Sequence, residues 1–301
     1  MVNIKNLVKQ LLIKQGYDIA LHPIAKEAYE GPKIAFVHIA KCAGMSVDKA
    51  LRQAIALPQQ QRIDRDATLA ASVASFSKEI LSEEDSIAFS RHHAKNLSSI
   101  FDYYLAKQWQ YVSGHVTVNS ELLAKYANDY AFMTVLRDPV ERFKSNYIYN
   151  KLTNQNPFML PNALNTSRQS EAELIAEAEA IINSERGWQL ANTQTMFLTG
   201  RYPKDSADAE SMQIEVMGNL EQFKVVGFLD DLDAFAMQCS QLTERKITFE
   251  KINTQSSVMK KEEGVSNSLQ AYFSRPKTIN KLSDLCCSEL EIVGKARGKL
   301  S

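Results

Sequence analysis

The sequence predicts an α/β protein with three layers, in which a central parallel β-sheet is covered by helices on both faces. Four short apolar runs have the composition of buried strands, and segments with helical periodicity lie between them. This alternation is typical of crossover connections between parallel strands, and it argues against a β-sandwich or a helical bundle. The strand-like runs are residues 33–39, 111–113, 131–136 and 225–229, and the helical segments are residues 46–56, a helix that begins at 139, and residues 170–183, 187–199, 208–222 and 232–242.

The remaining segments are less regular. Residues 58–100 are polar and rich in Gln, Ser and Ala, so they predict no particular element, whereas a polar loop near 253–268 precedes an amphipathic C-terminal helix. Apolar residues at helical spacing before Gly16 predict a short N-terminal helix. We expect this helix to pack on the domain or, alternatively, to lie on an anionic membrane surface. The chain then divides into this helix with its lead-in, residues 1–30, and a single domain, residues 31–301.

Composition excludes several classes of protein. The 301 residues include 35 Lys and Arg and 35 Asp and Glu, which leaves no net charge. We therefore expect no nucleic-acid partner, and any anion site must be local. The apolar runs are too short for a transmembrane segment. The four cysteines form neither a disulfide framework nor a zinc-binding pattern, which favours a cytoplasmic protein that binds no metal.

The first segment that suggests a chemistry is residues 36–46, where a predicted strand turns through a short loop into a helix. Such a turn directs backbone N–H groups and the helix N-terminus at one spot, which suits a phosphate or sulfate group. Lys41 lies within reach of such an anion, Gly44 lets the backbone approach a ligand, and Ser46 can cap the helix or bind the anion. The P-loop pattern GxxxxGK[ST] is absent, which disfavours magnesium-assisted phosphoryl transfer.

A second candidate anion site lies in residues 135–147. Asp138 before a proline predicts a helix start, and Glu141 completes a capping-box pattern. Arg137 would then leave the carboxyl end of a strand, where open parallel sheets bind ligands, and Ser145 would lie about two turns into the helix. An arginine beside a hydroxyl suits a phosphate monoester, whereas the simpler alternative is a surface Arg–Asp pair.

The five histidines are candidate proton acceptors. His115 directly follows a predicted strand, so we expect it at the same carboxyl edge as the two anion segments. There it would act as a general base or as a structural histidine. His38 lies on a strand and more simply packs against the loop. His92 and His93 lie in a basic polar stretch that favours a solvated face, although they could also line the groove of an acidic acceptor. His22 has no evident partner.

Together the two anion segments resemble the sulfotransferase superfamily. FVHIAKCAGMS at 36–46 resembles its 5′-phosphosulfate-binding loop, commonly FxHIPKTGGTS, and LRDPVERFKSNY at 136–147 resembles its 3′-phosphate-binding element. NTQTMFLTG at 192–200 and VGF at 226–228 fit the branch that contains the heparan sulfate and uronyl 2-O-sulfotransferases and their bacterial relatives. The resemblance covers roughly residues 33–242.

The resemblance implies a P-loop-like sulfotransferase fold and transfer of a sulfuryl group from 3′-phosphoadenosine-5′-phosphosulfate (PAPS) to an acceptor hydroxyl, without a metal. Arg137 and Ser145 would hold the 3′-phosphate. His115 would take the acceptor's proton as the general base, and Lys41 would neutralise charge on the departing oxygen. The acceptor would be a carbohydrate or a small hydroxylated molecule. The 5′-phosphosulfate would be held by the loop residues Lys41, Cys42, Ala43, Gly44, Met45 and Ser46.

The sequence departs from the family pattern in several places. Met45 replaces a threonine and removes a hydroxyl near the 5′ group, and Met196 replaces an arginine often found after Gln-Thr. Cys42 replaces another threonine near a helix N-terminus, which would lower its pKa, and we interpret it as a loop residue rather than a nucleophile. Lys260 and Lys261 lie where relatives close over the nucleotide, although a surface lysine pair is the simpler interpretation.

Two other functions remain as alternatives. A P-loop kinase acting on a small molecule would bind ATP with magnesium, and the missing Lys-Ser/Thr pair argues against it. A non-catalytic relative would bind a nucleotide or a glycan and serve in an assembly. The methionines at positions 45 and 196 keep this second alternative open.

Overall fold

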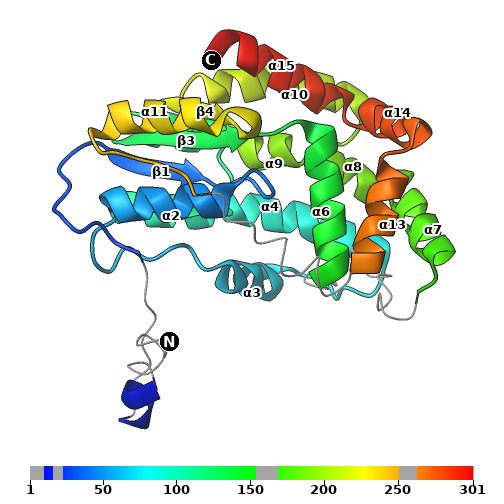
Figure 1. Cartoon of the computed structure of the whole chain (residues 1–301), viewed down its shortest axis with the longest axis horizontal. Coiled ribbons are helices and arrows are strands. Elements are labelled where there is room, and N and C mark those ends of the chain that lie inside the picture. The colour runs from blue at the N-terminus through cyan, green and yellow to red at the C-terminus, as the bar shows by residue number, and fades with distance from the viewer. Residues whose placement is uncertain (1–9, 16–22, 154–168, 251–262, 301) are drawn as a thin grey trace.

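The computed structural model of the protein describes residues 10–15, 23–153, 169–250 and 263–300. Its described strands are β1 (Lys33–Val37), β2 (Tyr111–Gly114), β3 (Tyr130–Leu136) and β4 (Val225–Phe228). They form one sheet in the order β2-β1-β3-β4, and every pair is parallel (Figure 1). The predicted α/β class with a parallel sheet is confirmed, and each strand falls on one of the four predicted runs.

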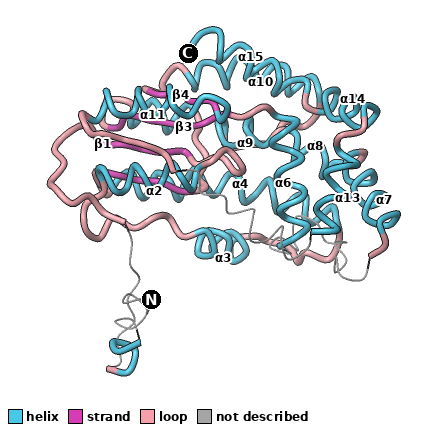
Figure 2. Tube along the Cα trace, viewed as in Figure 1, coloured by secondary structure: helices cyan, strands magenta, loops and turns pink. Residues whose placement is uncertain are grey.

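Helices connect the strands and cover the sheet (Figure 2). Most of the predicted helical segments are found within a few residues of their expected ends. The described helices are α2 (Gly44–Ile55), α3 (Arg65–Ser75), α4 (Glu83–Ala106), α5 (Ser120–Tyr126), α6 (Pro139–Thr153), α7 (Glu171–Ile182), α8 (Glu185–Ala191), α9 (Thr193–Thr199), α10 (Ser206–Leu220), α11 (Leu232–Thr243), α13 (Glu263–Phe273), α14 (Pro276–Leu285) and α15 (Cys287–Leu300), with a short 3₁₀ turn η2 (Leu229–Asp231) before α11.

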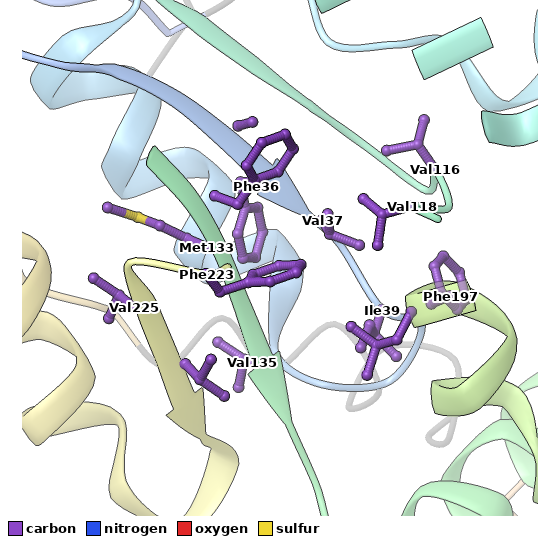
Figure 3. Close-up of a cluster of buried hydrophobic side chains, with 14 of the residues drawn as sticks. Phe36, Val37, Ile39, Val116, Val118, Met133, Val135, Phe197, Phe223 and Val225 are labelled. Atoms are coloured by element: carbon purple, nitrogen blue, oxygen red, sulfur yellow. The ribbon is translucent and has the colours of Figure 1, made fainter. Parts of the chain in front are cut away.

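The core lies on both faces of the sheet, because successive side chains of a strand point to opposite sides. Phe132 of β3 packs edge-on against Phe101 of α4 and contacts Phe223, which follows α10, with ring centroids 6.2 and 5.8 Å apart. The next residue, Met133, faces the other way and lies 3.8 Å from Cys239 of α11. Figure 3 shows the apolar side chains that close this core around β1 and β3. The sheet is therefore the middle of three layers.

A second hydrophobic cluster is built by α6, α7, α8, α13 and α14. Figure 1 shows these helices grouped beyond the carboxyl ends of the strands. Phe143 and Tyr147 of α6 pack edge-on against Phe273 of α13, with ring centroids 6.4 and 5.4 Å apart. This packing holds α6, which begins directly after β3, against the carboxyl edge of the sheet.

Residues 58–100, which predict no element from sequence, contain α3 and most of α4. Asp64 caps α3 by accepting from the backbone N–H groups of the first turn, and Ser82 with Asp85 forms a capping box for α4. The apolar periodicity of α4 is weak because small hydroxyl residues share its buried face. These are Ser86, Ser90 and Ser98.

Two other predicted segments differ in extent. The predicted helix over 187–199 is broken into α8 and α9 at Asn192, whose side chain (2.9 Å) and backbone N–H (3.1 Å) both donate to the Trp188 carbonyl. The predicted loop near 253–268 ends earlier than expected, since α13 already begins at Glu263. The single predicted C-terminal helix is a series, α13 to α15, in which Pro276 starts a new helix.

Only part of the predicted N-terminal helix lies in the described residues. Residues 10–14 are helical, and Leu11 and Ile13 are more than half exposed. The expected membrane-surface contact and the domain boundary at residue 31 stay predictions. None of the described helices is long and apolar enough to cross a membrane.

The edge of the sheet at β2 is covered by the segment 57–64, which joins α2 to α3. The Ile63 N–H donates to the Ser113 carbonyl (3.1 Å), and the Gln60 side-chain oxygen accepts from the Tyr111 N–H (3.2 Å). These bonds satisfy edge groups that would otherwise be open to another chain. The two bonds also place residues 61 and 62 alongside β2, toward its carboxyl end.

A buried ion pair joins α2 to β2. Arg52 and Asp48 lie one turn apart on α2 with nitrogen and oxygen 3.2 Å apart, and both are almost fully buried. Asp48 also accepts from the hydroxyls of Tyr111 (2.9 Å) and Ser113. Arg52 donates to the Ser113 hydroxyl (2.9 Å) and to the Gln60 carbonyl (2.6 Å). Each of the two buried charges therefore has one opposite charge and at least two hydrogen bonds inside the protein.

Arg52→Leu is expected to destabilise the protein by about 3 kcal/mol, because it leaves the buried Asp48 carboxylate without its nearest cation. Urea denaturation measures the change in the free energy of unfolding. Lys49→Leu is the matched control, since Lys49 on the same helix forms an exposed pair with Glu250 (2.7 Å), which contributes less than about 1 kcal/mol. If the two variants lost the same free energy of unfolding, the buried pair would contribute no more to stability than the exposed pair.

Candidate active site

The parallel pairing of the strands brings three chain segments to one edge of the sheet. β1 pairs with both β2 and β3, and Val37 at the end of β1 lies opposite Gly114 at the end of β2. The loop 38–43, His115 and Arg137 follow these strand ends directly. The structure therefore brings together the loop, the candidate base and the candidate phosphate-binding arginine at the edge where open parallel sheets bind ligands.

The loop 38–43 has an unusual backbone. Lys41 (φ 69°) and Ala43 (φ 57°) both adopt the left-handed conformation, which costs free energy for residues with a side chain. Ala43 precedes α2 and offers no side-chain cap to it. The Ala43 carbonyl accepts from the N–H groups of Ser46 (3.0 Å) and Val47 (3.3 Å), so the N–H groups of Gly44 and Met45 are the ones that an anion could reach at the positive end of the helix.

A packing constraint applies at Gly44, whose expected role beside a ligand stays a prediction. A Cβ at this position would lie 1.7 Å from Cδ2 and 1.9 Å from Nε2 of His38. Glycine is therefore required here because the His38 ring packs directly on the first turn of α2. The backbone approach of a ligand is not needed to explain this glycine.

Lys41 lies between an aromatic ring and a second cation. Its Nζ is 3.8 Å from the centre of the Tyr149 ring on α6, and its carbonyl accepts a hydrogen bond from Arg137 Nη1 (3.0 Å). Burial, followed by the positive charge of Arg137, lowers the pKa of Lys41 to about 8. Ser145 lies one turn before Tyr149 on α6, so the spacing directs both side chains to the face that meets the loop.

Arg137 is fixed through its own backbone. Its N–H donates to the side-chain oxygen of Gln194 on α9, and its carbonyl accepts from the Gln194 side-chain nitrogen, both at 3.0 Å. Asp138 caps α6 as expected by accepting from the Glu141 N–H (2.9 Å), whereas the Glu141 carboxylate pairs with Lys144 (2.8 Å). Burial lowers the pKa of Arg137.

His115 is held by one of its ring nitrogens. Its Nδ1 lies 2.8 Å from the His38 carbonyl, which can only accept, so Nδ1 carries the proton and Nε2 keeps its lone pair. The two histidine rings stack with centroids 4.1 Å apart. Burial, and then the positive charge of Arg62, lowers the pKa of His115 to about 4. The imidazole is therefore neutral at neutral pH and able to accept a proton, and its low pKa makes it a weaker base than an ordinary histidine.

His38 packs against the loop, as the simpler interpretation proposed. Its Nδ1 lies 2.7 Å from Arg62 Nη2, and burial lowers its pKa well below the usual value. His92 and His93, expected on a solvated face, instead contact the hydroxyls of Ser75 and Ser72 on α3, each at 2.8 Å.

Arg62 is a site residue that the sequence analysis missed. It lies in the segment 57–64 that covers β2, and it contacts the His38 ring, the Met45 sulfur (3.0 Å) and Asp48 (3.9 Å). No local signal identifies it, because residues 58–100 match no motif. Tyr149 was also missed, although it lies four residues after Ser145 on the same helix.

The loop residues differ in exposure. Cys42 is fully buried, and burial raises its pKa to about 12, which reverses the expected effect of the helix N-terminus. It is therefore no nucleophile at neutral pH. Ser46 is buried, whereas Met45 is 48% exposed. The remaining candidates His22, Lys260 and Lys261 lie outside the described residues.

No group of three or more His, Cys, Asp or Glu within the described residues is arranged to hold a metal ion. Comparison with known proteins identifies the family. A family model described as the sulfotransferase family matches residues 29–291, which is most of the chain and includes every segment of the site. No curated protein matches the chain significantly. With its parallel sheet and the two anion segments at one edge, the chain belongs to the sulfotransferase family.

Proposed function

We propose that the protein transfers a sulfuryl group from PAPS to a hydroxyl of a carbohydrate or of a small hydroxylated molecule. The observation that carries the proposal is the convergence of Lys41 and Arg137 at the uncapped N-terminus of α2, beside the neutral His115. Cations and backbone N–H groups suit an anionic donor, and a neutral imidazole suits removal of a proton from a hydroxyl.

The two anion segments would divide the donor between them. Residues 41–46 would bind the 5′-phosphosulfate through the first N–H groups of α2 and the Lys41 ammonium. Arg137 and Ser145 would bind the 3′-phosphate, since a guanidinium and a hydroxyl suit a phosphate monoester. In support, the Arg137 guanidinium reaches the loop itself, so both ends of the donor would meet one connected structure.

The transfer step follows from these positions. His115 Nε2 would take the proton of the acceptor hydroxyl while the acceptor oxygen forms a bond to sulfur. The bond between sulfur and the 5′-phosphate oxygen breaks, and Lys41 would stabilise the charge left on that oxygen. Orientation of the reactants would supply much of the rate enhancement, and the base about 10²–10⁴-fold.

The acceptor class rests on the resemblance to the branch of heparan sulfate and uronyl 2-O-sulfotransferases. Its pocket is expected beside His115, where the segment 57–64 brings Arg62 to the site. A cytoplasmic location remains a prediction from composition.

The first prediction concerns the donor. 3′-Phosphoadenosine-5′-phosphate at about 100 times its dissociation constant will stabilise the protein by about 2.7 kcal/mol, measured by thermal unfolding. Arg137→Ala will lose most of this stabilisation, whereas Arg201→Ala, which removes an arginine from an exposed ion pair with Asp208, will keep it. Stabilisation by ADP with magnesium alone would instead support a kinase.

The second prediction concerns the base. His115→Asn keeps a side-chain N–H for the His38 carbonyl but removes the basic nitrogen, so kcat should fall about 10²–10⁴-fold. Binding of 3′-phosphoadenosine-5′-phosphate, measured by calorimetry, should stay within about threefold of the original. His92→Asn serves as the control because His92 contacts α3 rather than the site. An unchanged kcat in His115→Asn would remove His115 from the mechanism.

The third prediction concerns pH. Lys41 is cationic below its pKa of about 8, so its attraction for the donor is complete at lower pH and is lost as pH rises through that value. The dissociation constant for 3′-phosphoadenosine-5′-phosphate should therefore increase above pH 8, by up to about tenfold per pH unit. Lys41→Arg should abolish this dependence, because arginine stays charged. The same pH dependence in that variant would assign it to another group.

A further inference from the structure

Gln194 and Glu289 lie behind Arg137. The Gln194 amide binds both the N–H and the carbonyl of Arg137, as described above. Its nitrogen also donates to Glu289 Oε2 on α15 (3.2 Å), and Glu289 Oε1 accepts from the Thr195 N–H (2.8 Å). Both hydrogens of the Gln194 nitrogen are thus used, one on Arg137 and one on Glu289.

The cluster is fully enclosed. Gln194 and Glu289 are each 1% exposed, so neither is available to a ligand from solvent. Burial raises the pKa of Glu289, and the positive charge of Arg142 of α6, which is also completely buried, partly offsets this rise. Arg142 donates to the Leu190 carbonyl, and its Nε and Nη1 have no hydrogen-bond partner within the described residues. The positive charge of Arg142 interacts favourably with the negative charge of Glu289.

The carboxylate favours the same orientation of the Gln194 amide as the Arg137 backbone does. A carboxylate can only accept, so it faces the Gln194 nitrogen and leaves the Gln194 oxygen for the Arg137 N–H. If the amide were flipped, its oxygen would face the carboxylate, and its nitrogen would face the Arg137 N–H. Both contacts would be repulsive, and Arg137 would lose its two backbone bonds.

We propose that Glu289 is a positioning residue for the donor site: by orienting Gln194 it holds the Arg137 backbone so that the guanidinium reaches the Lys41 carbonyl and faces the 3′-phosphate. This inference rests on the proposed function, because the 3′-phosphate is the ligand assigned to Arg137. It adds a residue of the last described helix, which no sequence motif singles out.

The test is Glu289→Gln, which keeps the size and shape of the side chain but has one oxygen for two donors, so that it presents an N–H either to the Gln194 nitrogen or to the Thr195 N–H. Calorimetry with 3′-phosphoadenosine-5′-phosphate should show at least tenfold weaker binding than the unchanged protein. Binding of 5′-AMP, which lacks the 3′-phosphate, should change less than threefold. Glu291→Gln is the matched control, since Glu291 on the same helix forms an exposed pair with Lys295 (3.4 Å).

A double-mutant cycle separates positioning from general damage. In an Arg137→Ala background, Glu289→Gln should weaken binding of 3′-phosphoadenosine-5′-phosphate by less than twofold, because the residue that it positions has lost its guanidinium. Gln194→Ala should also weaken binding of 3′-phosphoadenosine-5′-phosphate selectively, because it removes the side chain that binds the Arg137 backbone. It leaves the bond between Glu289 and the Thr195 N–H in place. Circular dichroism and thermal unfolding establish that each variant is folded.

Each outcome has one meaning. Failure of the unchanged protein to bind 3′-phosphoadenosine-5′-phosphate would overturn the proposed function. If it binds and Glu289→Gln behaves like Glu291→Gln, or weakens 5′-AMP equally, the positioning role is wrong while the donor assignment stands. The same tenfold loss with and without Arg137 would also overturn the positioning role. Selective loss in both Glu289→Gln and Gln194→Ala supports it.

Discussion

The parallel hydrogen-bonding of β1 with β2 on one side and β3 on the other is the constraint on which the whole site depends. It places His115 and Arg137 beside the loop that follows β1, although the three segments are far apart in the sequence. If a strand shifted by one residue relative to its neighbour, its side chains would point to the opposite faces of the sheet. Its apolar side chains would then lose their contacts with the helices. The buried pair of Arg52 and Asp48 attaches α2 to β2, and it thereby fixes the loop that precedes α2 relative to the sheet.

The protein has no net charge, yet three cations gather at the candidate active site. Lys41, Arg137 and Arg62 surround two neutral histidines, and burial keeps His38 and His115 uncharged. Asp48, which lies 3.9 Å from Arg62, is buried, whereas Asp138 and Glu141 near Arg137 are exposed and engaged by the α6 backbone and by Lys144.

Much of this arrangement was predictable from sequence, because it is encoded in short contiguous patterns. Buried strands, the helix start at Asp138 and the loop around Lys41 are local features, so the fold class and the positions of His115 and Arg137 at one edge could be predicted. Contributions that depend on tertiary contacts could not. The need for glycine at position 44 depends on the His38 ring, and the break at Asn192 involves a side chain that shares the Trp188 carbonyl with its own backbone N–H.

The order of these elements along the chain has a consequence during translation. β1 is the first strand to leave the ribosome, yet it lies in the middle of the sheet, and its neighbours are made only later. Glu289 and the rest of α15 follow later still. The apolar side chains of β1 therefore stay without strand partners until the chain has been made through β3, which ends at Leu136, and they are open to non-specific association during that interval.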